Sequence, residues 1–224
     1  MVKRKRKGPT AERYIETTLE LVAEQGGSSQ VNLREISRRI GCAHTNTYNY
    51  FESREDLLWH ALRRVLQQYG DAMTSGLYDS ESPSSNFRRL MRNMVEWSID
   101  NPGLHRFISS DPIRPEQIPQ DIIENVLTMK AWINQTLKAL SDSQIDGEAL
   151  RDLVDIMLGY LDGEVFNLIN GRVLPGENIA GRVINNLERL FSLLTATTHD
   201  GIVLSEQLPE VKKSDLPKLN VSFY

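Results

Sequence analysis

The sequence has one cysteine, Cys42, no apolar run of roughly 18 residues, and no motif typical of an enzyme active site. A single cysteine excludes an internal disulfide and fits a reducing compartment. Because there is no candidate transmembrane segment, we expect a cytoplasmic protein with no membrane partner. Since no nucleophile elbow, phosphate-binding glycine loop or paired metal-ligand motif is present, we expect no enzyme activity, no metal and no cofactor.

Histidine is also sparse, and its four copies are scattered: His44, His60, His105 and His199. His44 lies close to Cys42, which would suit a metal or redox site, but two ligands in one turn are too few for a metal centre. We therefore favour Cys42 as a small core residue of that turn.

Charge is unevenly distributed along the 224 residues, whose net charge is -4. Residues 1–70 hold 12 Lys and Arg against 8 Asp and Glu, whereas residues 71–224 hold 14 against 22. A basic front and an acidic rear suit a protein that approaches a polyanion in one orientation, and double-stranded DNA is the partner we expect. The hydrophobic content of 40% is ample for a core.

Residues 32–56 have the pattern of a helix-turn-helix, in which the second helix is presented to DNA. Asn32 can cap the first helix, with Glu35 placed to reach back in a capping box. Gly41 stands at the turn, where glycine ends a helix in the left-handed conformation without steric cost. The second helix, predicted over 44–51, is about two turns long and polar. We expect its neighbours to hold it and its exposed side to bind DNA.

The candidate DNA ligands are donors and acceptors suited to base edges and phosphate oxygens. Those expected to face bases are His44, Thr45 and Asn49, with Asn46 a further donor on the same helix. Those expected to hold phosphates are Asn32, Tyr48, Tyr50 and Arg54.

A basic arm at residues 1–9 contains five consecutive cations, Lys3, Arg4, Lys5, Arg6 and Lys7. Such a run repels itself, so we expect it to be disordered alone and to lie along phosphates or in the minor groove of DNA. A solubilising tail is the alternative.

The helix-turn-helix resembles that of the tetracycline-repressor (TetR) family of transcriptional regulators, over roughly the first 60 to 70 residues. The resemblance rests on a glycine turn, an aromatic-x-aromatic-Phe ending and a Ser-basic-Glu-x-Leu-Leu sequence, here Gly41, Tyr48, Tyr50, Phe51, Ser53, Arg54, Glu55, Leu57 and Leu58. The chain departs from the family at Ala43, Asn46 and Thr47, so base preference cannot be inferred by analogy. Residues 97–108 resemble part of the family's ligand-binding half. The resemblance implies an all-α fold, with an N-terminal three-helix helix-turn-helix DNA-binding domain plus a C-terminal helical ligand-binding and dimerisation domain.

Apolar periodicity predicts further helices at 10–25, 54–74, 87–101, 102–108, 121–140, 148–170 and 178–197. We assign 10–56 to the DNA-binding domain, 57–74 to a connecting helix, 87–198 to the ligand-binding and dimerisation domain, and 199–224 to an extended tail. Residues 75–86 are rich in serine and are predicted as a loop. The first helix carries an acidic stripe, which consists of Glu12, Glu16, Glu20 and Glu24. We interpret this stripe as a solvated face.

The last two helices are candidates for a homodimer interface, as a four-helix bundle with their copies. Gly159 and Gly163, one turn apart, would let another helix approach closely. Because one recognition helix contacts only a few base pairs, a two-fold dimer on a palindromic operator is the usual route to a specific site. The alternative is that both helices complete a monomer core.

Methionine and aromatic side chains are concentrated on the rear helices, and such side chains can line an adaptable apolar cavity. The candidate ligand-pocket residues are Met91, Met94, Trp97, Phe107, Met129, Trp132, Met157, Tyr160 and Phe166. An ordinary core is the alternative for any one of them. Asp155, Asp162 and Glu164 lie on the most apolar helix, where an inward-facing carboxylate would favour a cationic or hydrogen-bonding ligand, although solvated or interfacial positions are equally open.

Together these features predict a homodimeric DNA-binding regulator, a repressor released from a palindromic operator by a small apolar or amphipathic ligand. Two alternatives stay open. One is a DNA-binding regulator controlled by a protein partner on the acidic rear or the tail. The other is a ligand-binding protein whose helix-turn-helix is idle.

Overall fold

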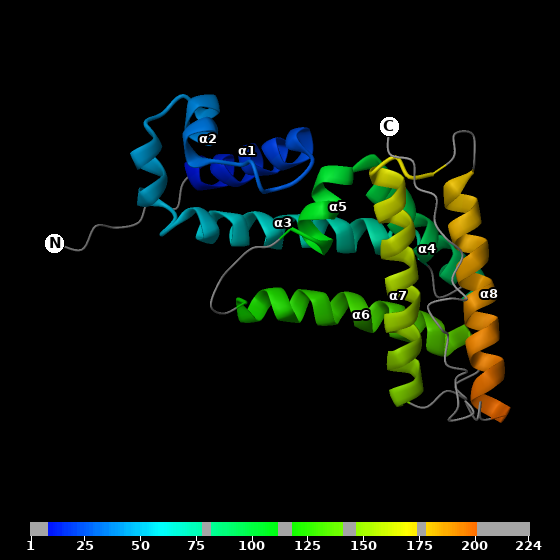
Figure 1. Ribbon diagram of the computed structural model, residues 1–224. Coiled ribbons are helices and arrows are strands. Elements are labelled where there is room, and N and C mark those ends of the chain that lie inside the picture. The colour runs from blue at the N-terminus through cyan, green and yellow to red at the C-terminus, as the bar shows by residue number, and fades with distance from the viewer. Residues whose placement is uncertain (1–8, 78–81, 112–117, 141–146, 174–177, 201–224) are drawn as a thin grey trace, which may run out of the picture.

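The computed structural model describes residues 9–77, 82–111, 118–140, 147–173 and 178–200, and of residues 9, 10 and 196–200 the backbone alone. Within these residues the chain is helical and has no strand, which confirms the all-α fold class (Figure 1). The elements are α1 (Pro9–Gln25), α2 (Leu33–Ile40), the 3-10 helix η1 (His44–Asn49), α3 (Arg54–Thr74), α4 (Pro83–Asp100), α5 (Pro102–Ser109), α6 (Gln120–Leu140), α7 (Gly147–Ile169) and α8 (Ile179–Asp200). The predicted tail lies outside the described residues beyond position 200.

Two hydrophobic cores hold the described helices together. The front core lies between α1, α2, α5 and the first part of α3, and includes Tyr14, whose ring meets Phe51 edge to face with centroids 6.1 Å apart. The rear core lies between the end of α3 and α4, α6, α7 and α8. Trp97 and Met129 pack against both cores. Figure 1 shows α1 and α2 on one side of α3, and α7 and α8 side by side at the far end of the molecule.

α3 runs through both cores. Its N-cap is Ser53, whose hydroxyl accepts a hydrogen bond from the Asp56 amide (3.0 Å). Leu57 near its start is buried in the front core, whereas Tyr69 and Met73 near its end are buried in the rear core. A shift of this helix would therefore disturb both cores.

Two predicted boundaries are wrong. The second helix of the helix-turn-helix is a 3-10 helix that ends at Asn49, because Ala43 gives it no side-chain cap and its polar and β-branched residues are weak helix formers. α4 begins at Pro83, inside the predicted loop. There Ser82 accepts a hydrogen bond from the Ser85 amide (3.2 Å), and proline suits the first helical position.

The acidic stripe of α1 is not a purely solvated face. Glu24 forms two hydrogen bonds with Arg39 of α2, at 2.6 and 2.8 Å. Glu12 forms an ion pair with Arg64 of α3 at 2.5 Å. Half of the stripe therefore ties α1 to its neighbours.

Cys42 is half-buried in the turn after α2, and its sulfur lies 2.9 Å from the Tyr14 hydroxyl. None of the helices in the described ranges is both long and apolar enough to cross a bilayer. The same ranges contain no group of three or more His, Cys, Asp or Glu side chains arranged to hold a metal ion.

Candidate nucleic-acid interface and ligand cavity

α2 is fixed at both ends by residues that the sequence marks. Its N-cap Asn32 accepts a hydrogen bond from the Glu35 amide (3.0 Å). Instead of closing a capping box, the Glu35 carboxylate accepts hydrogen bonds from Arg38 (2.7 and 2.8 Å) and Arg39 (3.1 Å), which lower the pKa of Glu35 to about 2. At the other end Gly41 is left-handed with φ of 81°, and its amide donates back into the last turn of α2.

η1 is held against α2 from its buried side. Thr47 is fully buried, and its hydroxyl lies 3.3 Å from the Ser37 hydroxyl of α2. The Phe51 amide donates to the Thr47 carbonyl (3.0 Å), and the Phe51 ring belongs to the front core. These contacts stabilise a helix that is too short to be stable by itself.

The opposite side of η1 carries exposed polar side chains. The predicted base contacts His44, Thr45 and Asn49 are exposed, and Tyr48 is 57% exposed. Asn46 is half-buried, and its side-chain carbonyl accepts a hydrogen bond from Asn49 Nδ2 (2.7 Å). Because an amide nitrogen carries two hydrogens, Asn49 keeps one donor and its carbonyl acceptor for a base edge.

Two predicted phosphate ligands also have contacts inside the protein. Tyr50 is half-buried, with its ring centroid 5.9 Å from that of Tyr14. Arg54 donates from Nε to the Val31 carbonyl and from a terminal nitrogen to the Ser28 carbonyl, both at 2.8 Å. These bonds tie the loop after α1 to the start of α3, so Arg54 has a structural role whatever it does at DNA.

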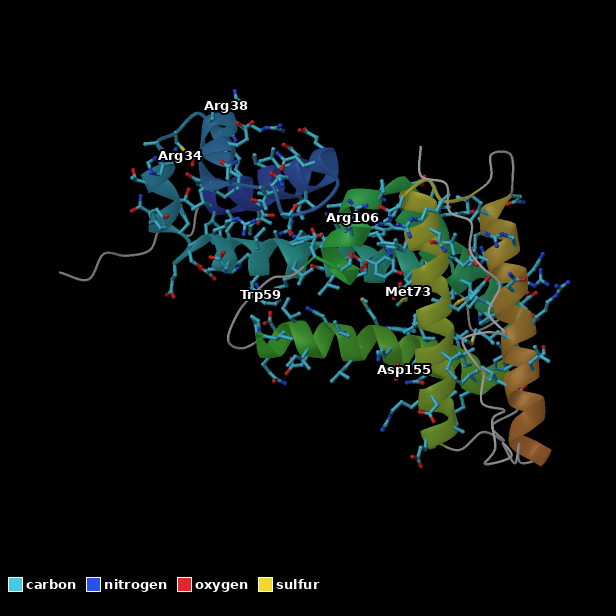
Figure 2. All side chains as sticks on the ribbon, in the orientation of Figure 1. Arg34, Arg38, Trp59, Met73, Arg106 and Asp155 are labelled. Atoms are coloured by element: carbon cyan, nitrogen blue, oxygen red, sulfur yellow. The ribbon has the colours of Figure 1, made fainter. Side chains whose placement is uncertain are left out.

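Two cations of α2, Arg34 and Arg38, were not predicted as DNA ligands. Both are exposed, and Figure 2 shows them at the end of the molecule that carries α2 and η1. Arg38 is paired with Glu35, whereas Arg34 has no ion pair among the described residues. Their i, i+4 spacing, which puts both on one helix face, is the sequence signal that could have found them.

The basic arm, residues 3–7, lies outside the described residues, and its contact with DNA stays a prediction. Without these five cations, residues 1–70 would hold 7 Lys and Arg against 8 Asp and Glu. Ion pairs with carboxylates already engage most of the seven, namely Arg38, Arg39, Arg54, Arg63 and Arg64. The positive charge of the front therefore comes mainly from the arm.

A cavity of about 360 Å³ lies between α3, α5, α6 and α7. Its wall is mostly apolar, and the residues from α3 are Trp59, Leu62, Leu66, Tyr69 and Met73. Figure 2 shows Trp59 and Met73 on the side of α3 that faces α6. Because Ile118 and Val126 of the wall are exposed, the cavity opens to solvent. Its size and lining suit a small organic ligand.

Three of the nine predicted pocket residues line this cavity, namely Met94, Phe107 and Met129. The other six lie outside its wall. Met91 and Met157 are buried in the rear core, and Trp97 packs on Tyr69 with ring centroids 4.8 Å apart. Trp132 and Phe166 are exposed. The Tyr160 hydroxyl accepts a hydrogen bond from Asn186 of α8 (2.8 Å).

The polar groups of the wall come from several helices. His105 of α5 is 3% exposed, and its Nδ1 has no hydrogen-bond partner among the described residues. Burial lowers the pKa of this imidazole to about 4, so the ring is neutral at pH 7. Asp162 of α7 is exposed, yet desolvation by the neighbouring side chains raises the pKa of its carboxyl. Burial, together with the nearby Asp162 charge, raises the pKa of the Tyr69 phenol.

α5 connects the cavity with the DNA-binding end. Phe107 lines the cavity, while the adjacent Arg106 donates to the Gly26 carbonyl (2.7 Å) in the loop after α1. Just after α5, Asp111 lines the cavity and accepts a hydrogen bond from the Ser28 amide of the same loop. A displacement of α5 would therefore be transmitted to the loop that leads into α2.

α7 and α8 leave part of their surface uncovered. Ile156 and Phe166 of α7 are exposed, and Leu193 of α8 is 65% exposed. A Cβ atom added at Gly159 or Gly163 would meet nothing within 4 Å, so this part of α7 is open to close approach by another helix. The homodimer itself stays a prediction.

No protein-family model and no curated protein matches the sequence. Solved structures, however, share its fold over most of the chain. A TetR-family regulator from Streptomyces coelicolor is 16% identical, with a TM-score of 0.66 over 85% of this chain and 83% of its own. One from Bordetella parapertussis is 18% identical, with a TM-score of 0.60 over 83% and 94%. The fatty acid degradation regulator FadR from Bacillus halodurans is 16% identical, with a TM-score of 0.58 over 85% and 96%. The chain therefore has the fold of the TetR-family transcriptional regulators, as the resemblance of its helix-turn-helix implies.

Proposed function

We propose that the protein is a DNA-binding transcriptional regulator, a homodimeric repressor that a small ligand releases from a palindromic operator. The observation that carries the DNA-binding part is the exposed polar side of η1. The exposed side carries His44, Thr45 and Asn49. On the buried side of the same helix, Thr47 contacts Ser37 of α2. A polar helix with few stabilising contacts of its own is suited to present side chains to the major groove.

A second copy of the chain would supply a second recognition helix. One η1 is six residues long and can contact only a few base pairs. The exposed apolar side chains of α7 and α8, with Gly159 and Gly163 between them, offer a surface for a two-fold interface in which the same patch is used on both copies. The dimer proposal rests on this surface.

Ligand control is proposed because the cavity and the DNA-binding end share α3 and α5. A molecule between α3 and α6 would press on Phe107 of α5, and through Arg106 and Asp111 on the loop after α1. A coupling of about 1 to 3 kcal/mol is enough to change DNA affinity roughly 5- to 150-fold. We assign the weaker DNA binding to the ligand-bound form, and we propose that the ligand-free form represses transcription at the operator.

Selection of duplexes from a random pool by the full-length protein tests this function. We expect a palindrome whose affinity falls steeply with salt, by about 0.9 in log K per log salt for each phosphate neutralised. Recovery of no sequence above background would contradict DNA recognition. Recovery of a single unrepeated half-site would contradict the dimer while leaving DNA recognition standing.

A further inference from the structure

The wall of the cavity indicates the head group of its ligand. We propose that the effector is an amphipath with a protonated amine, whose ammonium lies against Asp162 while its apolar part lies between α3 and α6. This inference deepens the ligand control proposed above and rests on it.

The charges of the wall carry the inference. The cation of the described wall is Lys130, whose Nζ lies 2.8 Å from Oδ1 of Asp155 on α7. Asp155 itself is not part of the wall. Asp111 accepts a hydrogen bond from the Ser28 amide. Asp162 forms no hydrogen bond or ion pair with any described residue. The described wall therefore has an unpaired carboxylate and no unpaired cation.

An ammonium would supply the missing partner of Asp162. Asp162 is exposed but partly desolvated, and a partly desolvated carboxylate is stabilised by a nearby positive charge more strongly than the same group in bulk water. An anionic head group would instead meet the Asp162 charge, and could use Lys130 only by competing with Asp155. The Tyr69 phenol, which interacts electrostatically with Asp162, stays protonated, and its oxygen is a further acceptor for an ammonium.

His105 is a further polar residue of the cavity wall. Its Nδ1 is buried without a partner among the described residues, and its ring is part of the cavity wall. The cavity thus combines a long apolar wall with polar contacts on α3, α5 and α7.

The test compares three probes that differ only in head group. Octylamine, octan-1-ol and octanoate are titrated into the full-length protein at pH 7.4 in a calorimeter, below their aggregation limits. We expect octylamine to bind at least about 10-fold more tightly than octanol, with octanoate weakest. In the Asp162→Asn variant, which keeps the shape but not the charge, octylamine affinity should fall about 10-fold and octanol affinity should change less than about twofold.

Asp71→Asn is the matched control. Asp71 is an exposed carboxylate on α3 that lies outside the cavity wall, so this variant should bind all three probes as the wild type does. Octanol or octanoate binding as tightly as octylamine, or no binding of octylamine, would overturn the inference. Unchanged octylamine affinity in a folded Asp162→Asn variant would do the same, and the wild-type series decides the question even if that variant does not fold.

DNA affinity measured with each probe separates this inference from ligand control. If octylamine binds as expected but leaves the affinity for the selected duplex unchanged, ligand control fails and the head-group assignment stands. If octanoate binds more tightly and releases the duplex, ligand control stands and the head-group assignment fails.

Discussion

The front of the molecule, from α1 to the first part of α3, buries its large apolar side chains, whereas the rear, from α6 to α8, leaves several exposed. Among the described residues, Tyr48 is the large apolar side chain exposed at the front. The rear exposes Leu127 and Trp132 on α6, Ile156 and Phe166 on α7, and Leu193 on α8, and together with α3 and α5 it encloses the cavity. The front presents polar groups on its surface, while the rear has surfaces suited to a ligand and to a second copy.

The largest effect is expected from the arm, because the front has little other free positive charge. Replacing all five arm cations, residues 3–7, by glutamine should lower affinity for the selected duplex about 100- to 1000-fold at low salt. The slope of log K against log salt should become shallower by up to about 4.5, as expected for five phosphate contacts. Binding measured by anisotropy over a salt series checks both values. A slope that changes by less than about 1 would mean that the arm is only a solubilising tail.

The exposed apolar side chains of α7 allow a test of whether this part of the rear is a dimer interface or the surface of a monomer. Phe166→Glu should raise the dimer dissociation constant at least about 100-fold, because a charge would be buried in the interface. Sedimentation equilibrium of the wild type and the variant measures this change. Leu127→Glu introduces the same charged side chain at an exposed site on α6 and should leave the association state unchanged. Equal behaviour of the two variants would contradict the assigned interface.

Much of the front follows from its sequence because its determinants are local. The cap Asn32 and the left-handed Gly41 act through residues within one turn, and both have the predicted geometry. The 3-10 character of η1 was missed because it depends both on its own weak helix formers and on the contact of Thr47 with Ser37, which joins two elements. Arg54 shows the same limit, since its carbonyl acceptors lie in a loop far back in the chain.

The cavity was harder to predict, because it depends on which helix faces meet. Composition pointed to methionine and aromatic residues of the rear helices, and only Met94, Phe107 and Met129 line the wall. Five residues of the wall come from α3, whose apolar stripe is indistinguishable from a core stripe in the sequence. His105 carries no sequence signal at all, because its place in the wall depends on how α5 packs against its neighbours.

Protonation of His105 should destabilise the folded protein in acid. Burial lowers the pKa of His105 from 6.5 to about 4. Between these two pH values the imidazole is therefore protonated in the unfolded chain and neutral in the folded chain. Stability should therefore fall as pH is lowered, by about 2.5 kcal/mol between pH 7.5 and 4.5. Urea unfolding of the wild type and of His105→Gln over this range measures the difference. The same pH dependence in both would show that His105 is not the group responsible.

The smallest effect concerns Arg54, where the structural and phosphate-binding roles can be separated. Arg54→Gln should reduce the free energy of unfolding by about 1.5 kcal/mol, because the Val31 and Ser28 carbonyls lose charged donors. If the role is structural, the salt slope for DNA binding should not change. A slope shallower by about 1 with unchanged stability would instead establish a phosphate contact.

The central claim is that the exposed side of η1 recognises the operator, and Asn49→Ala tests it most directly. Affinities of the wild type and the variant are measured for the selected duplex and for a scrambled duplex of the same composition. A lost base contact of about 1 to 3 kcal/mol predicts a roughly 5- to 150-fold weaker affinity for the selected duplex, with no change for the scrambled one. Equal losses on both duplexes, or no loss on either, would contradict the assignment of η1 as the recognition helix.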